Sequence, residues 1–184
     1  LNPDDAARVQ FHRLTARDGV KVPVWVTGAP AKGEPVKPTV VLVHGGPWVR
    51  GGYWEWERSA QFLASRGYLV VAPEFRGSDG YGRKLERAGW KQWGQSMQDD
   101  VTDALRFTVD KGWADPKRVC IAGASYGGYA TLMGLAKDGD LFRCGVDWVG
   151  VSDILLLFDA HWSDTSDLFK RFGMSERIGD REKD

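Results

Sequence analysis

Residues 120–130 read CIAGASYGGYA, a run of small and apolar residues with one serine, Ser125, between glycines. The preceding residues 118–122 have the composition of a buried strand, and a glycine-rich helix start follows near Tyr126. Residues 123–127 match the pattern G-x-S-x-G, in which a serine occupies a cramped turn and the flanking positions tolerate little beyond glycine. The stretch therefore predicts a strand, a sharp elbow and a helix, with Ser125 as an exposed nucleophile.

A glycine-rich turn between a strand and a helix can instead bind phosphate, as in dinucleotide-binding folds. The pattern G-x-G-x-x-G of those folds is absent, and the turn follows the third buried strand rather than the first. The nucleophile hypothesis is therefore favoured. With 23 glycines in the chain, the five-residue match alone is moderate evidence, and its setting between a strand and a helix adds to it.

Strand and helix patterns alternate on both sides of the elbow. Further strands are predicted at residues 10–16, 21–26, 39–43, 68–77 and 144–151, and helices at residues 56–66 and 96–112, the second with Ser96 and Asp99 as a weak capping box. The first two strands are joined by the turn signal RDGV and predict a hairpin. The pattern predicts an α/β fold with a doubly wound, mostly parallel sheet and an N-terminal antiparallel hairpin. From Ser152 onward only helical pieces and a charged end are expected, so the sheet's final strands would be missing.

The composition is that of one globular domain of 184 residues, 42% of them hydrophobic. Because 25 basic residues balance 25 acidic ones, no global field favours binding to nucleic acid or to an anionic membrane. No window approaches 18 uninterrupted apolar residues, and the start, LNPDDAARVQ, has neither an apolar signal segment nor an initiator Met. We therefore expect a soluble protein, cytoplasmic or periplasmic. The missing initiator Met also leads us to expect that the sequence is an excised or processed piece of a longer one.

The two cysteines, Cys120 and Cys144, lie in apolar segments with strand patterns, which favours buried free thiols over a disulfide. No clustered Cys/His ligand set and no phosphate loop occurs in the sequence. We therefore expect neither a metal nor an organic cofactor.

An acyl-transfer serine needs two N–H donors for the oxyanion, one from the residue after the serine and one from a loop after an earlier strand. Tyr126 supplies the first. The second is predicted in the loop 44–47, His-Gly-Gly-Pro, because its two glycines let backbone amides approach a substrate closely. His44 itself is disfavoured as the catalytic base, since in hydrolases with this sheet the base follows the serine in the chain.

Four motifs, in this order and spacing, resemble the catalytic domain of the prolyl oligopeptidase family of serine peptidases, above all its acylaminoacyl-peptidase and dipeptidyl-peptidase branches. They are HGGPW at residues 44–48, PEFRGSDGYGRKLERAGWKQWGQSMQDD at 73–100, GASYGGYA at 123–130 and GVDWVGVSD at 145–153. The resemblance covers nearly all of residues 10–184. It implies an α/β-hydrolase fold with Ser125 as nucleophile and the amides of Gly46 and Tyr126 as oxyanion donors.

The chain departs from this family in two respects. Family members usually carry an N-terminal β-propeller, and we expect residues 1–184 to be a partial catalytic domain without one. Members also carry a catalytic Asp and then a His, expected roughly 80 and 110 residues past the serine and hence beyond residue 184. Ser125, Asp153 or Asp159, and His161 also follow the order Ser, Asp, His within the chain. The few residues between these aspartates and His161 leave no room for the strands that would bring a base back to the elbow. His161, like His12 on the hairpin, is therefore expected to be a surface or hydrogen-bonded histidine.

The family's acyl-side pocket is apolar, and by resemblance Tyr126, Val151, Ile154 and Leu157 would line it. Ile154 and Leu157 are equally well explained as core residues, and Trp48 as a pocket rim or as packing. The chain has 9 tryptophans, and those in the loops GYWEWERSA and GWKQWG are expected to pack rather than to form a binding platform.

Hydrolysis of short peptides through an acyl-enzyme at Ser125 is the leading functional hypothesis. A carboxylesterase or lipase is the alternative within the same chemistry. The alternative from another class is a non-catalytic truncated fragment. The expected partners are a short peptide substrate and either the missing C-terminal segment or a propeller domain, without nucleic acid or membrane.

Overall fold

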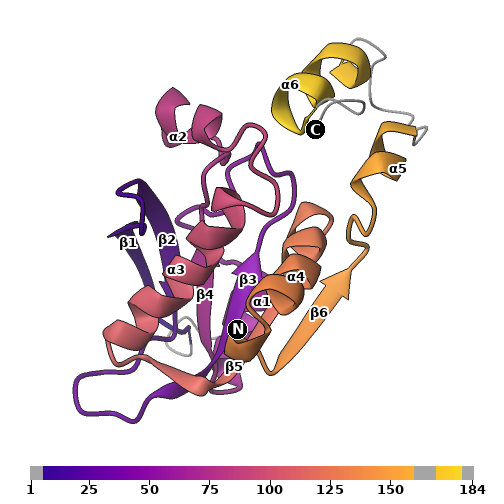
Figure 1. Ribbon diagram of the computed structural model, residues 1–184. Helices are drawn as coiled ribbons and strands as arrows, with labels where there is room; N and C mark the ends of the chain where they lie inside the picture. Colours follow the sequence, from indigo (N-terminus) through magenta and orange to yellow (C-terminus); the bar gives the residue numbers. More distant parts are fainter. Residues whose placement is uncertain (1–5, 160–168, 180–184) are drawn as a thin grey trace.

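The computed structural model describes residues 6–159 and 169–179, in which six strands form one sheet in the order β1-β2-β4-β3-β5-β6 (Figure 1). The strands are β1 (Val9–Thr15), β2 (Lys21–Thr27), β3 (Lys37–Val43), β4 (Leu69–Pro73), β5 (Ala114–Ala124) and β6 (Cys144–Trp148). The helices are α1 (Arg58–Ser65), α2 (Arg83–Ala88), α3 (Ser96–Asp110), α4 (Tyr126–Lys137), α5 (Ile154–Asp159) and α6 (Ser175–Arg177), with a 3-10 turn at Gly139–Leu141 and a π-helical segment at Phe169–Met174. β1 pairs antiparallel with β2 and β2 with β4, and the other neighbours are parallel. This confirms the predicted hairpin and mostly parallel sheet.

The helices cover the two faces of the sheet unequally. Alternate residues of the central strands, such as Val41 and Ile121, belong to the buried core with residues of α3 and α4. The intervening residues, such as Leu42 and Ala122, lie on the opposite face with Ala60 of α1 and line a cavity of about 330 Å³. Most of the buried core thus lies on the α3 and α4 side of the sheet.

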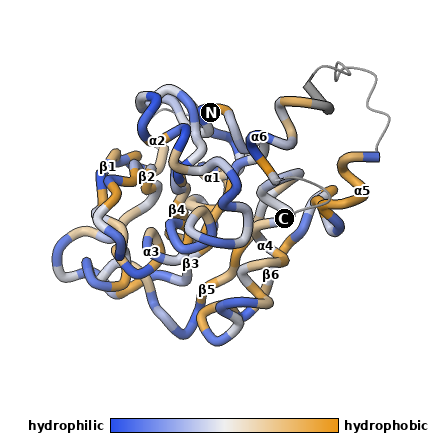
Figure 2. Tube along the Cα trace, turned by 45° about the horizontal axis from the view of Figure 1, so that its top comes forward, coloured by the Kyte–Doolittle hydropathy of each residue, from blue (hydrophilic) through white to orange (hydrophobic). Residues whose placement is uncertain are grey.

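β6 is the outermost described strand beside β5. All its residues are exposed, including Val146 at 60% and Trp148 at 71%. α5 and α6 lie beyond the ends of the parallel strands, and Figure 2 shows the hydrophobic colouring of α5 away from the main body of the fold. These helices confirm the expectation of helical pieces after Ser152 within the described residues.

Glycines mark the C-terminal ends of two helices as the sequence predicts, whereas the predicted start of α3 differs. Gly67 and Gly112 adopt positive φ values of 89° and 69° and follow α1 and α3, as the sequence predicts. The predicted capping box of α3 is wrong: Gln95 occupies the N-cap position without a side-chain bond, and the Ser96 hydroxyl donates to Gln92 Oε1. The cause is that the chain already turns at Gln92–Gln95, which places Ser96 inside the first helical turn.

The expectation of buried free thiols is also wrong. Cys120 and Cys144 form a disulfide between β5 and β6, and Cys144 is exposed. The two residues are paired directly in the parallel register, with their Cα atoms 4.7 Å apart, which lies within the range that a disulfide spans. The bond ties the exposed strand to the strand that carries the elbow.

Candidate active site

Ser125 lies at the turn between β5 and α4 in a strained backbone conformation. Its φ is 56° and its ψ is −119°, values that a non-glycine residue adopts only when the surrounding structure holds it there. The residue is exposed, although the first turns of the helix after it are buried. This is the geometry of a serine presented to substrate at a nucleophile elbow, as the sequence predicts.

The glycines on either side of Ser125 are required by close backbone contacts. A Cβ at Gly123 would lie 2.5 Å from the carbonyl carbon of Gly127, and a Cβ at Gly127 would lie 2.1 Å from the carbonyl oxygen of Val43. Neither glycine has a positive φ. The G-x-S-x-G pattern therefore reflects the tight packing of α4 on the end of β3, and the steric reason given from the sequence is confirmed.

A cavity of about 400 Å³ opens beside Ser125. Of the residues predicted to form the site, Ser125, Gly46, Tyr126, Val151 and Leu157 line it. Ile154 does not line it, although like Val151 and Leu157 it packs, partly buried, against the core. Its neighbour on α5, Leu156, lines the cavity in its place.

Among the cavity residues that the sequence did not predict, three come from segments distant in the chain. Trp93 lies in the GWKQWG motif, which had been assigned to packing, and it both lines the cavity and stacks edge-on against Tyr126 with ring centroids 4.7 Å apart. Met174 and Ile178 reach the cavity from the segment 169–179, more than forty residues past the serine. Only the tertiary fold brings that segment to the elbow.

The segment 169–179 is held against the residues around Trp48 and Trp90. The Arg177 guanidinium lies 5.2 Å from the ring centroid of Trp48 and 5.7 Å from that of Trp90. The Lys91 amide donates to the Arg177 carbonyl at 2.7 Å. Trp48 thus lines the cavity, packs against the core and forms a cation–π contact with Arg177. It is therefore both a rim residue of the pocket and a packing residue, the two interpretations that the sequence left open. Trp54 is 70% exposed, but its ring packs edge-on against the Trp25 ring with centroids 4.9 Å apart, in line with the packing expectation for the loop tryptophans.

The predicted oxyanion donors flank Ser125 from two elements. Tyr126 is the first residue of α4, a position whose N–H has no acceptor within the helix. Gly45 lies so close that its Cβ would be 3.5 Å from the Ser125 Cβ, and Gly46 follows it into the cavity with a φ of 118°. Gly46 and Tyr126 therefore line the same cavity as Ser125.

His44 is not placed to act as the catalytic base. Its Nδ1 lies 2.7 Å from the Gly45 carbonyl oxygen and its Nε2 lies 3.0 Å from the Ser78 hydroxyl, so both nitrogens are engaged away from Ser125. Burial lowers the pKa of His44 to about 4, and the bond to Gly45 opposes this only in part. Glu74 Oε2 lies 3.7 Å from Nε2, beyond hydrogen-bond distance, and accepts from backbone amides instead, so we take His44 as neutral.

Within residues 6–159 and 169–179, the other candidate residues offer no base beside Ser125. His12 lies on β1, four strands away from β5, or about 19 Å at the usual strand spacing. Asp153 accepts from the amides of Leu155 and Leu156 and so caps α5. His161 lies outside the described residues.

A buried ion-pair network fixes the loop behind the site. Arg76 donates to Asp100 from Nε and Nη2, both at 2.8 Å, and its backbone N–H donates to the same carboxylate. Arg76 also pairs with Asp18 in the hairpin turn at 2.6 Å. Hydrogen bonding to Asp100 is the main cause that raises the pKa of Arg76, so the guanidinium stays charged. The network joins the hairpin, the loop after β4 and α3.

A mostly parallel sheet with a strained serine at a strand-to-helix elbow, and a glycine-rich loop beside it, defines the α/β-hydrolase class. A family model described as the prolyl oligopeptidase family matches residues 54–177. The chain belongs to the prolyl oligopeptidase family, which confirms the resemblance seen in the motifs. Its homologues are serine peptidases, which supports hydrolase chemistry for this chain.

Dipeptidyl aminopeptidase BIII of Pseudoxanthomonas mexicana is 41% identical over 158 residues, 83% of this chain and 22% of that protein. A solved puromycin-hydrolyzing peptidase of Mycobacterium tuberculosis matches with a TM-score of 0.86 and 30% identity, over 98% of this chain and 27% of that one. The Pyrococcus horikoshii acylaminoacyl peptidase matches with a TM-score of 0.81 and 28% identity, over 97% of this chain and 28% of that one. The chain therefore spans about a quarter of the length of these proteins.

In residues 6–159 and 169–179 no group of three or more His, Cys, Asp or Glu side chains is placed to hold a metal ion. No helix in the same part of the chain is long and apolar enough to cross a membrane.

Proposed function

We propose that the protein containing this chain is a serine peptidase that cleaves short peptides through an acyl-enzyme at Ser125. The observation that carries the proposal is the strained Ser125 at the mouth of a cavity that Gly46 and Tyr126 also line. The names of the relatives, a dipeptidyl aminopeptidase and an acylaminoacyl peptidase, support a short peptide substrate.

In the proposed reaction a histidine, oriented by an aspartate, removes the proton of the Ser125 hydroxyl as its oxygen attacks the substrate carbonyl carbon. The Gly46 and Tyr126 amides stabilise the resulting oxyanion, and each such donor contributes about 10²–10³ in rate. The C–N bond then breaks, and the amine leaves with the proton from the histidine. Water attacks the acyl-enzyme with the same residues in the same roles and releases the acid.

We place the aspartate and the histidine outside residues 1–184. The engagement of His44 and the distance of His12 support this, because neither offers a ring nitrogen to Ser125. The exposed β6 and the quarter coverage of the relatives support a larger catalytic domain, and we infer that the rest of the protein supplies the base, further strands and an N-terminal propeller.

The acyl-side pocket is proposed to be the cavity beside Ser125. Tyr126, Val151 and Leu157 give it apolar walls, and Trp93 and Met174 extend them. Such walls favour a hydrophobic or Pro-like side chain before the scissile bond.

The test compares an aminoacyl anilide with a short-chain nitrophenyl ester on the full-length protein. Peptidase function predicts turnover of both, because an enzyme that cleaves amides also cleaves the more reactive ester. Ester turnover without detectable anilide turnover would establish the carboxylesterase alternative.

A second test addresses the divided site. The full-length protein should react with a fluorophosphonate probe at Ser125, and Ser125→Ala should abolish labelling. Isolated residues 1–184 should label only at background rate, since no base removes the serine proton. Failure of the full-length protein to label would favour the non-catalytic alternative, and rapid labelling of the isolated chain would place the base inside it.

A further inference from the structure

The Gly45–Gly46 peptide unit determines where one of the proposed oxyanion donors points. The Gly45 carbonyl and the Gly46 N–H belong to the same planar unit, and in a trans peptide they point in opposite directions. Two consecutive glycines place little steric restriction on rotation of that plane, and Gly46 already has a φ of 118°. A group that holds the Gly45 oxygen therefore also sets the direction of the Gly46 N–H.

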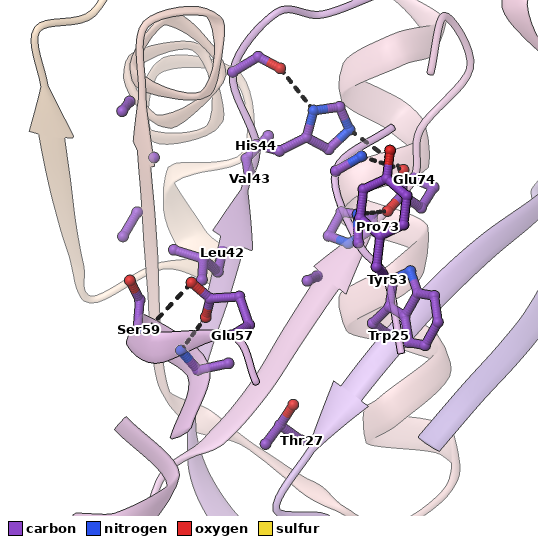
Figure 3. A pocket seen from close by; sticks show the side chains of 18 of the residues that line it. Trp25, Thr27, Leu42, Val43, His44, Tyr53, Glu57, Ser59, Pro73 and Glu74 are labelled. Atoms are coloured by element: carbon purple, nitrogen blue, oxygen red, sulfur yellow. Dashed lines mark hydrogen bonds and ion pairs between the residues drawn. The ribbon is translucent and has the colours of Figure 1, made fainter. Parts of the chain in front are cut away.

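His44 is that group. Its Nδ1 lies 2.7 Å from the Gly45 carbonyl oxygen, which can only accept, so Nδ1 carries the proton. In the neutral ring Nε2 is then an acceptor, and the Ser78 hydroxyl donates to it at 3.0 Å. Figure 3 shows the His44 ring between its backbone partner on one side and Glu74 on the other.

The His44 ring is held by Phe75 and by the backbone at Gly51. The Phe75 ring stacks on it with centroids 4.4 Å apart and an interplanar angle of 14°. Gly51 packs so closely on it that a Cβ there would lie 2.3 Å from the His44 Cδ2. Glu74 accepts from the amides of Gly51 at 2.9 Å and Gly52 at 2.5 Å, which keeps this strip of backbone against the ring.

We propose that His44 is a positioning residue of the oxyanion hole, whose Nδ1–H holds the Gly45 carbonyl and thereby directs the Gly46 N–H toward the substrate at Ser125. The proposal rests on the proposed function, because it takes Gly46 as an oxyanion donor. His44 acts through the backbone and touches no reacting atom. Glu74, Phe75 and Ser78 keep its ring in place.

The test uses substitutions at His44 in the full-length protein. His44→Leu keeps the branch at Cγ but removes the Nδ1–H donor. It should lower kcat by about 10² with little change in KM. His44→Asn places an amide N–H at the same number of bonds from Cα as Nδ1, and should recover at least tenfold of that loss. His12→Asn is the matched control on the distant edge strand and should leave both constants unchanged.

A transition-state readout separates positioning from general damage. A peptide aldehyde forms a tetrahedral adduct with the serine, so its affinity should fall in His44→Leu by the same factor as kcat/KM. The affinity of the peptide product acid, which forms no such adduct, should stay within about twofold of the wild-type value. A merely structural role for His44 would weaken both ligands together or neither.

The outcomes are distinguishable. A full-length wild-type protein that fails to label with fluorophosphonate refutes the proposed function, whatever the variants do. An active wild type with a folded His44→Leu of unchanged kcat overturns the positioning role, and so does equal loss in the Asn and Leu variants. If His44→Leu does not fold, His44→Gln replaces it, because its amide lies one bond farther from Cα. The Asn variant must then exceed the Gln variant in kcat for the proposal to stand.

Discussion

Substituting Gly127 by alanine tests whether the elbow depends on close packing of α4 against β3. The Cβ of alanine would lie 2.1 Å from the Val43 carbonyl oxygen, 2.9 Å from its carbon and 3.1 Å from the His44 oxygen. All three neighbours are backbone atoms at the end of β3, so no side-chain rotation relieves the clash. The helix or the strand end must withdraw by about 1 Å to restore an ordinary contact.

We expect two consequences of Gly127→Ala. Overpacking against backbone should lower the free energy of unfolding by about 3 kcal/mol, at the upper end of the usual range. A displacement of about 1 Å between Ser125 and the loop carrying Gly46 should slow fluorophosphonate labelling by about 10²-fold, because the attack geometry is lost.

Gly139→Ala is the matched control for the glycine substitution. Gly139 has no positive φ, and a Cβ there meets nothing within 4 Å. The control should therefore change stability by less than about 0.5 kcal/mol and leave labelling intact. Urea denaturation and labelling rates of the full-length variants give both quantities. Wild-type labelling by a folded Gly127→Ala would refute the role assigned to this glycine.

Three further predictions concern stability, and urea denaturation measures each. Asp100→Ala removes the buried carboxylate partner of Arg76 and leaves only the half-exposed Asp18, so it should cost about 3 kcal/mol, and a loss below about 1 kcal/mol would contradict the buried network. Reduction of the Cys120–Cys144 bond, at a sequence separation of 24, should cost about 3 kcal/mol, and Cys144→Ser should remove the effect of reductant. Because the pKa of His44 is about 4 when folded and 6.5 ordinarily, the unfolded chain binds the proton first as pH falls. The free energy of unfolding should therefore drop by about 3 kcal/mol from pH 7 to pH 4. Burial also raises the pKa of the nearby Glu74, which titrates in both proteins. His44→Asn should therefore lack only the part of the pH dependence that His44 contributes.

The elbow could be predicted from the sequence because its cause is local. The G-x-S-x-G pattern encodes contacts among residues within a few positions of Ser125 and the end of one earlier strand. The helix ends at Gly67 and Gly112 were predictable for the same reason. Helix α2 was not predicted, since it is six residues long and buries only Leu85, too little for a periodic pattern.

The disulfide and the cavity walls could not be predicted, because they depend on register and on distant segments. Pairing of Cys120 with Cys144 needs both the adjacency of β5 and β6 and their alignment, and neither is written in the apolar character of the strands. Ile154 and Leu156 are both apolar, and only the rotation of α5 decides which of them lines the cavity. The contribution of Met174 to the cavity wall depends on the position of the segment 169–179, which no local sequence signal predicts.

The order of the strands supports the proposed division of the catalytic centre. β3 and β5 are parallel neighbours with Val43 paired to Gly123, so the oxyanion loop after β3 and the elbow after β5 emerge side by side. One part of the sheet thus brings together the serine and both proposed donors. The same loop commits His44 to Gly45, and a buried neutral imidazole that holds the oxyanion loop cannot also remove the Ser125 proton. The arrangement of His44 therefore supports the proposal that the base comes from a different element, which we place outside residues 1–184.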